Sequence, residues 1–186
     1  MITRQNTKPF VFRDLALMGV LSALATMVSV ASAMVIHATG LIAVPGLSGF
    51  LVSLTTSVVI YVVLRKIPRF GALTIMAAVN ALVVMLAMGK PWSAVAVLMG
   101  GLAGDAYMAA TSGHRGRWSP IVALVIYRGV REVTGLVMPM LIGVTQSRVA
   151  FYIMLISILG GICGAFVGGL SGRSLMDRLA KSGVVR

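Results

Sequence analysis

The chain has 186 residues, of which 59% are hydrophobic and only 11% are charged, and its mean hydropathy is +1.01. A water-soluble domain of this size needs a more polar surface, so these values exclude one and predict an integral membrane protein. The formal net charge of +12 is spread over short clusters between apolar runs, which argues against a nucleic-acid partner because such a partner requires a gathered basic face.

Charged residues, prolines and glycines divide the chain into six apolar segments. Each segment is long enough to cross a hydrocarbon core of roughly 30 Å at about 1.5 Å per residue. We therefore predict an all-α membrane protein in which residues 1–186 form a single domain, a bundle of six transmembrane helices followed by a basic tail at 173–186. The predicted helices are at about residues 11–38, 45–64, 70–88, 92–111, 119–144 and 148–172.

The first segment has a second interpretation, a secretory signal peptide. Basic residues precede it, and its apolar run ends in Ala31-Ser32-Ala33, which resembles a cleavage site. The run from Leu15 to Ile36 is, however, as long as a bilayer core requires and longer than a usual signal core. We expect a retained first helix.

The distribution of cations predicts the orientation. Twelve lysines and arginines flank the bundle on the side of the two termini, whereas only Lys90 and Arg148 lie on the other side. By the positive-inside rule we expect both termini to be cytoplasmic. We also expect the membrane to be the cytoplasmic membrane of a prokaryote. The twelve are Arg4, Lys8, Arg13, Arg65, Lys66, Arg69, Arg115, Arg117, Arg173, Arg178, Lys181 and Arg186.

Small residues recur at four-residue spacing in two of the predicted helices. The last helix contains Gly160, Gly164, Gly168 and Gly172, and the fourth contains Ala96, Gly100 and Gly104. Such spacing lets helix backbones approach closely in lipid. It indicates either ordinary bundle packing or a smooth surface that slides against a neighbour.

Charged side chains interrupt the fifth helix within "YRGVREVTG", residues 127–135. Arg128, Arg131 and Glu132 share one arc of this helix, with Arg128 at a depth of roughly 13 Å and Asp105 of the fourth helix at roughly 10 Å. Asp105 is therefore expected to be the intramembrane charge partner of Arg128. The four residues either neutralise one another and fix the packing of two helices, or form part of a ligand site.

The ligand-site interpretation gives these residues different roles. Arg131 lies a turn nearer the outer face than Arg128, so it is the better candidate for binding an anionic or strongly polar group. Glu132 is a candidate for binding a cationic or hydrogen-bond-donating part of the same ligand. Trp92 is either an interfacial anchor or a stacking lid, and Asn80 either an interhelical hydrogen bond or a substrate contact.

Several kinds of chemistry have no pattern in this sequence. The stretch "MGKPWS" is not a nucleotide-binding loop, no zinc-binding histidine spacing occurs, and the single Cys163 cannot form an internal disulfide. No nucleophile is accompanied by a base. We expect no metal site, no cofactor and no enzymatic activity in this chain.

Several stretches resemble the substrate-binding S components of energy-coupling factor (ECF) transporters. "FRDLALMGVLSALATMV" resembles the first helix of such proteins, and the closing "LMDRLAKSGVV" resembles their C-terminus. "LRKIPRFGALTIMA", "MLAMGKPWSAV" and "GGLAGDAYMAATSGHRGRWSP" resemble the Trep_Strep or MptD family of S components. The resemblance extends over nearly the whole chain.

This resemblance implies partners and a function. The partners would be a transmembrane coupling protein, the T component, and two cytoplasmic ATPases that supply energy. Gly19 and Ala23 match the small-x-x-x-small pattern by which S components contact the coupling protein, although the family usually has alanine at both positions. The resemblance also implies a small-molecule substrate, a vitamin, cofactor or precursor, bound between helices four to six. Substrate release inside would involve toppling of the whole S component.

Two other classes of function stay open. One is a membrane-embedded enzyme acting on a lipid or lipophilic substrate through Asp105 or Glu132. The other is a small stand-alone channel, carrier or assembly factor. A metal-ion substrate is disfavoured because the chain begins Met1-Ile2-Thr3, without the histidine behind the first methionine of cobalt and nickel S components.

Overall fold

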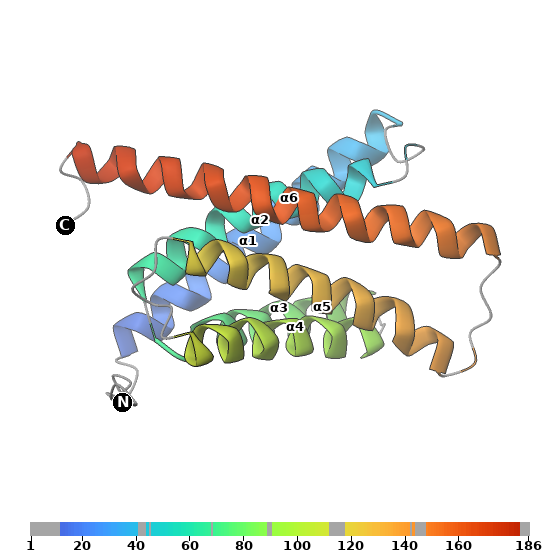
Figure 1. Cartoon of the computed structure of the whole chain (residues 1–186), viewed down its shortest axis with the longest axis horizontal. Coiled ribbons are helices and arrows are strands. Elements are labelled where there is room, and N and C mark those ends of the chain that lie inside the picture. The colour runs from blue at the N-terminus through green and yellow to red at the C-terminus, as the bar shows by residue number, and fades with distance from the viewer. Residues whose placement is uncertain are drawn as a thin grey trace.

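The computed structural model describes residues 12–40, 44, 46–67, 69–88, 91–111, 118–141, 143 and 148–182. The described residues form six α-helices (Figure 1), which confirms the all-α prediction. The helices are α1 (Phe12–Ala38), α2 (Leu47–Lys66), α3 (Ala72–Met88), α4 (Pro91–Ala110), α5 (Ser119–Leu141) and α6 (Arg148–Lys181). Six of the basic residues used to predict the orientation lie outside the described residues: Arg4, Lys8, Lys90, Arg115, Arg117 and Arg186.

The helix ends lie close to the predicted ones, except at the end of α6. This helix continues to Lys181 and so includes most of the predicted basic tail. An even number of helices brings the start of α1 and the end of α6 to the same end of the bundle (Figure 1). We call this the terminal end and the opposite one the distal end.

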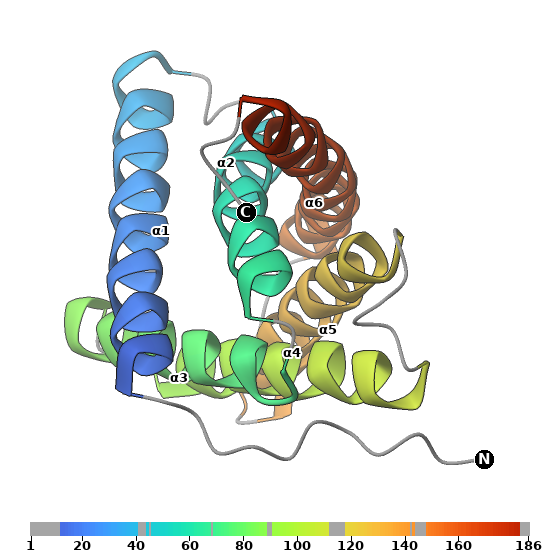
Figure 2. The same ribbon diagram turned by 90° about the vertical axis from the view of Figure 1, so that its left-hand side faces the viewer.

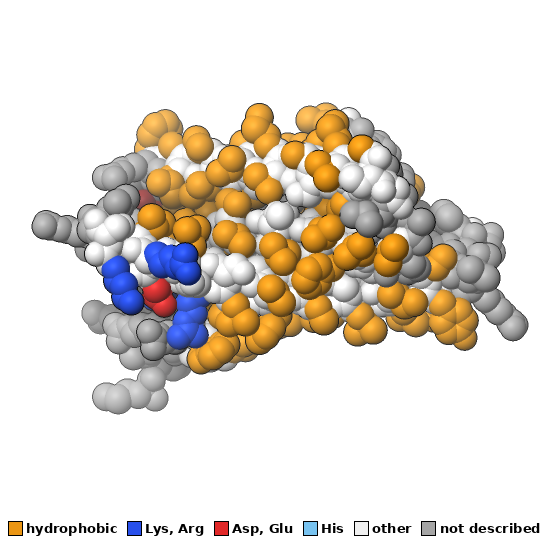
Figure 3. All heavy atoms as spheres, turned by 90° about the horizontal axis from the view of Figure 1, so that it is seen from above, with side chains coloured by type: hydrophobic (Ala, Val, Ile, Leu, Met, Phe, Trp, Pro, Cys, Tyr) orange, Lys and Arg blue, Asp and Glu red, His pale blue; other side chains and the backbone are white. Residues whose placement is uncertain are grey.

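Four of the described helices are long and apolar enough to cross a membrane: α1, α2, α4 and α6. The apolar run of α3 is shorter, Ala72–Leu86, and α5 contains three charged side chains in its middle. The surface over α6 carries mainly hydrophobic side chains, with Lys and Arg gathered at the terminal end (Figure 3). This distribution suits a bundle whose sides face lipid.

The closest packing in the bundle is between α2 and α6. A Cβ atom added at Gly164 would collide with the Phe50 carbonyl oxygen, and one at Gly168 with that of Leu54. Gly160, Gly164 and Gly168 therefore allow close backbone packing against residues 46–54, and we call this contact the glycine seam. Seen from the terminal end, α2 lies between α6 and the peripheral helix α1 (Figure 2).

Glycines also hold α4 against both of its neighbours. Gly100 and Gly104 face the α5 backbone at Tyr127 and Ala123, and Gly101 faces α3 at Ala77. Fully buried side chains, including Leu73, Met108, Ile121 and Leu124, fill the space between these helices. The terminal half of α5 thus lies in a closed apolar core.

Candidate functional site

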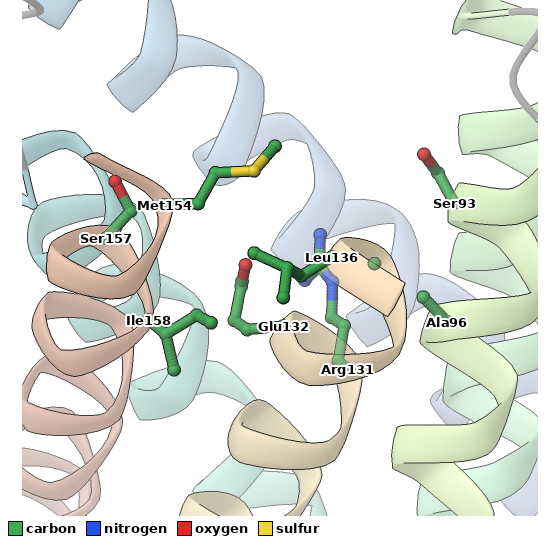
Figure 4. A pocket seen from close by; sticks show the side chains of 9 residues that line it. Ser93, Ala96, Arg131, Glu132, Leu136, Met154, Ser157 and Ile158 are labelled. Atoms are coloured by element: carbon green, nitrogen blue, oxygen red, sulfur yellow. The ribbon is translucent and has the colours of Figure 1, made fainter. Parts of the chain in front are cut away.

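A cleft of about 330 Å³ opens between α4, α5 and α6. Helix α5 forms its floor, and α4 and α6 form its two walls (Figure 4). Its lining comprises Ser93 and Ala96 of α4, Arg131, Glu132, Gly135 and Leu136 of α5, and Met154, Ser157 and Ile158 of α6. The volume is at the small end of the range for small-molecule sites.

The cleft exists because α4 and α6 both pack on α5 but not on each other. No described Cα atom of α4 lies within 8 Å of one in α6. The lining residues come from the first part of α4 and α6 and from the second part of α5, so the cleft is in the distal half of the bundle. The cleft lies between the same three helices where the resemblance implies a substrate site.

Arg128 and Glu132 form an ion pair on the floor helix. Arg128 Nη2 lies 3.0 Å from Glu132 Oε1, one helical turn away. Arg128 is 6% exposed and packs beside Gly161 of α6, where a side chain would crowd its Nε atom. Its Nε atom has no hydrogen-bond partner among the described residues. Each charge of the pair thus neutralises the other, and Arg128 lies behind the cleft lining rather than in it.

Arg131 differs from Arg128 in both position and partners. It lines the cleft and is only partly buried. The described residues include no ion-pair or hydrogen-bond partner for its guanidinium group. Because the other charges of α5 are paired, Arg131 gives the cleft one uncompensated positive charge.

The described contacts do not show the predicted pairing of Arg128 with Asp105. Asp105 is fully buried, and its Oδ2 accepts hydrogen bonds from the Thr74 amide at 2.7 Å and from Thr74 Oγ1 at 2.6 Å. The Leu73 amide is 3.4 Å from Oδ1. These amides belong to the first turn of α3, where no carbonyl within the helix can accept from them. Asp105 therefore caps α3, on the side of α4 that faces α3.

The structure does not bring Asn80 or Trp92 into the cleft lining. Asn80 lines a separate small cavity of about 10 Å³, together with Ser22, Thr56 and Tyr127. Trp92 precedes the lining residue Ser93 and is partly buried at the start of α4. Sequence reasoning missed Ser93, Met154, Ser157 and Ile158, because a serine or an aliphatic residue in an apolar helix carries no distinguishing signal.

Gly19 and Ala23 lie on α1, far from the cleft. A Cβ atom at Gly19 would have no atom within 4 Å, and Ala23 is exposed. This part of α1 is therefore open to lipid or to a partner. Within the described part of the chain, no three His, Cys, Asp or Glu side chains come together as metal ligands.

A family model described as a hypothetical bacterial integral membrane protein (Trep_Strep) matches residues 12–152. The matched range contains Arg128, Arg131 and Glu132 but ends before Ser157 and Ile158. No curated protein and no solved structure matches the chain.

Proposed function

The chain belongs to the Trep_Strep family of bacterial integral membrane proteins, and from this premise we propose that it is the substrate-binding S component of an ECF importer. In this role it lies in the cytoplasmic membrane with both termini inside. It captures a small organic vitamin, cofactor or precursor from outside. A T component and two cytoplasmic ATPases then supply the energy for delivery.

The observation that carries the proposal is a cleft confined to the distal half of the bundle. Arg131 and Glu132 line a distal cleft, whereas the terminal half of the same helix is packed among buried residues such as Ile121 and Leu124. A channel needs a continuous path, and these packed layers interrupt one. A binding subunit that depends on a partner for release fits a cleft confined to one half of the bundle.

The enzyme alternative has less support from the geometry. Asp105, one of its two candidate acids, caps α3 from a fully buried position. Glu132, the other, is held by Arg128. Among the described residues, Asp105 binds the Thr74 amide and hydroxyl and Glu132 binds Arg128, so each carboxylate already has a structural partner.

The exposed part of α1 supports a partner surface at Gly19 and Ala23. The test is co-expression with a tagged ECF coupling module, followed by purification through the tag. We expect the chain to be retained, and we expect leucine at both Gly19 and Ala23 to lower retention about tenfold, since bulk at a close helix contact prevents approach. Ala31→Leu, at another exposed site on α1, is the matched control and should leave retention unchanged.

If the wild-type chain is never retained by a coupling module but moves a solute by itself in liposomes, the S-component proposal is wrong. A stand-alone carrier would then be the better description.

A further inference from the structure

We propose that the cleft selects an organic monoanion: a small acid with one carboxylate and one hydrogen-bond donor on an otherwise apolar body. The inference rests on the proposed function, because it treats the cleft as a substrate site, and it specifies the chemical class of that substrate. It is based on the charges, the hydrogen-bond acceptors and the lining side chains of the cleft.

The charge balance of the cleft calls for a single negative charge. Arg128 and Glu132 are paired at 3.0 Å, and Asp105 is bonded to α3. Arg131 is the remaining charged group of the lining. A guanidinium offers five N–H donors in a planar fork, which matches the two oxygens of a carboxylate. One bound carboxylate would neutralise the floor of the cleft.

Glu132 disfavours a second negative charge on the ligand. Its side chain is 28% exposed, next in sequence to Arg131, and it lines the same cleft. A phosphate monoester carries about −1.5 to −2 charges at neutral pH, so the charge beyond the first would face this carboxylate without a cation. A cationic ligand would meet Arg131 instead. A monoanion avoids both repulsions.

Glu132 also provides an acceptor for a donor on the ligand. The ion pair with Arg128 uses Oε1, and a carboxylate can accept about four hydrogen bonds in all. The Glu132 carboxylate points toward the α6 side of the cleft, between Ile158 and Leu136, while Arg131 rises on the α4 side (Figure 4). An N–H or O–H group a few atoms from the carboxylate of the ligand would therefore face Glu132.

The walls accept an apolar body of limited size. Ala96, Leu136, Met154 and Ile158 provide hydrocarbon surface, and the polar side chains of the walls are Ser93 on α4 and Ser157 on α6. A volume of about 330 Å³ suits a small molecule.

A matched set of probes tests this class on the full chain in nanodiscs of zwitterionic lipid. The reference probe is N-acetylphenylalanine, which has one carboxylate, one amide N–H and an apolar ring. Three relatives each change one property: the primary amide removes the charge, the N-methyl acid removes the donor, and the phosphonate analogue adds charge. Binding is measured by isothermal titration calorimetry.

We expect the acid to bind wild-type protein about tenfold to a hundredfold more tightly than the amide or the phosphonate, because a charge-assisted hydrogen bond contributes on this scale. The N-methyl acid should bind about tenfold more weakly than the acid. Arg131→Gln should abolish the preference for the acid over the amide. Glu132→Gln should raise the affinity for the phosphonate relative to the acid about tenfold, which a purely structural role would not do.

Arg178→Gln is the control, because Arg178 is exposed near the end of α6, outside the cleft lining, and its loss should change no affinity. The inference is overturned if the acid does not bind, if the amide or phosphonate binds as tightly, or if Arg131→Gln keeps the preference. The titration uses no coupling module. Failure here together with retention by the module would overturn the ligand class alone, whereas an acid preference without retention would overturn the S-component role.

Discussion

The two sides of α6 show how one helix can make both a closed contact and an open one. Toward α2 it presents Gly160, Gly164 and Gly168, and backbone meets backbone along the glycine seam. Toward α4 it presents Met154, Ser157 and Ile158 across a cleft of about 330 Å³. Small residues allow helices to close on each other in lipid, whereas the side of α6 that faces the cleft carries larger side chains.

The largest expected effect is at the glycine seam. Gly164→Leu would place side-chain atoms where the Phe50 backbone lies, so we expect the free energy of unfolding to fall by about 3 kcal/mol or more. Gly19→Leu, where no atom lies within 4 Å, is the matched control and should fold normally. Reversible unfolding in mixed detergent measures both. Equal stability of the two variants would mean that the seam is not closely packed.

The next effect concerns how α4 holds the first turn of α3. Asp105→Ala would leave the first amides of α3 without an acceptor, and we expect a loss of about 2–3 kcal/mol in the free energy of unfolding. Asp105→Asn retains one acceptor oxygen and should lose about half as much.

A double-mutant cycle of Asp105→Asn with Arg128→Ala separates this capping role from a direct charge pair. We expect the two effects to add within about 0.5 kcal/mol. A larger coupling would show that the two residues interact, as the sequence alone had indicated.

Arg128 and Arg131 are expected to behave oppositely, because only Arg131 lines the cleft. Arg128→Ala removes the partner of Glu132, and we expect a loss of about 1–2 kcal/mol in the free energy of unfolding, moderated because Glu132 is partly exposed. Arg131→Ala should change this free energy by no more than about 0.5 kcal/mol, because no described group loses a partner. It should instead weaken binding of N-acetylphenylalanine. Thermal melting and titration of both variants provide the check, and a larger stability loss for Arg131→Ala would reverse the assignment of roles.

The smallest effect is expected at the terminal end. Arg69 Nη1 lies 2.9 Å from Asp14 Oδ2 and ties α1 to the segment before α3, but both side chains are partly exposed. We expect Asp14→Asn to lower the free energy of unfolding by about 0.5 kcal/mol or less, and we expect this difference to shrink at high salt. Unfolding curves at low and high ionic strength measure it. An effect that does not depend on salt would point to a contact other than the ion pair.

The positions of the helices, the close glycine contacts and the charges within α5 could be predicted from the sequence, because they depend on local properties. Runs of apolar residues long enough to cross a bilayer define helices, and glycines at four-residue intervals define close contacts. Arg131 and Glu132 could be predicted as ligand-site candidates for a similar reason. A charge within an apolar helix must face either a partner or a cavity.

Only the tertiary structure decided which neighbour each face of a helix meets. Asp105 and Arg128 have similar depths, but depth is one coordinate. The rotation of α4 directs Asp105 and Gly101 toward α3 and Gly100 toward α5, while Gly104 lies against both helices. Both ridges of α4 carry small residues, so the sequence does not distinguish them. Ser157 and Ile158 reach the cleft because the glycine seam sets the rotation of α6. Local patterns thus determine the helices and their packing faces, whereas the pairing of faces depends on long-range packing that no short stretch encodes.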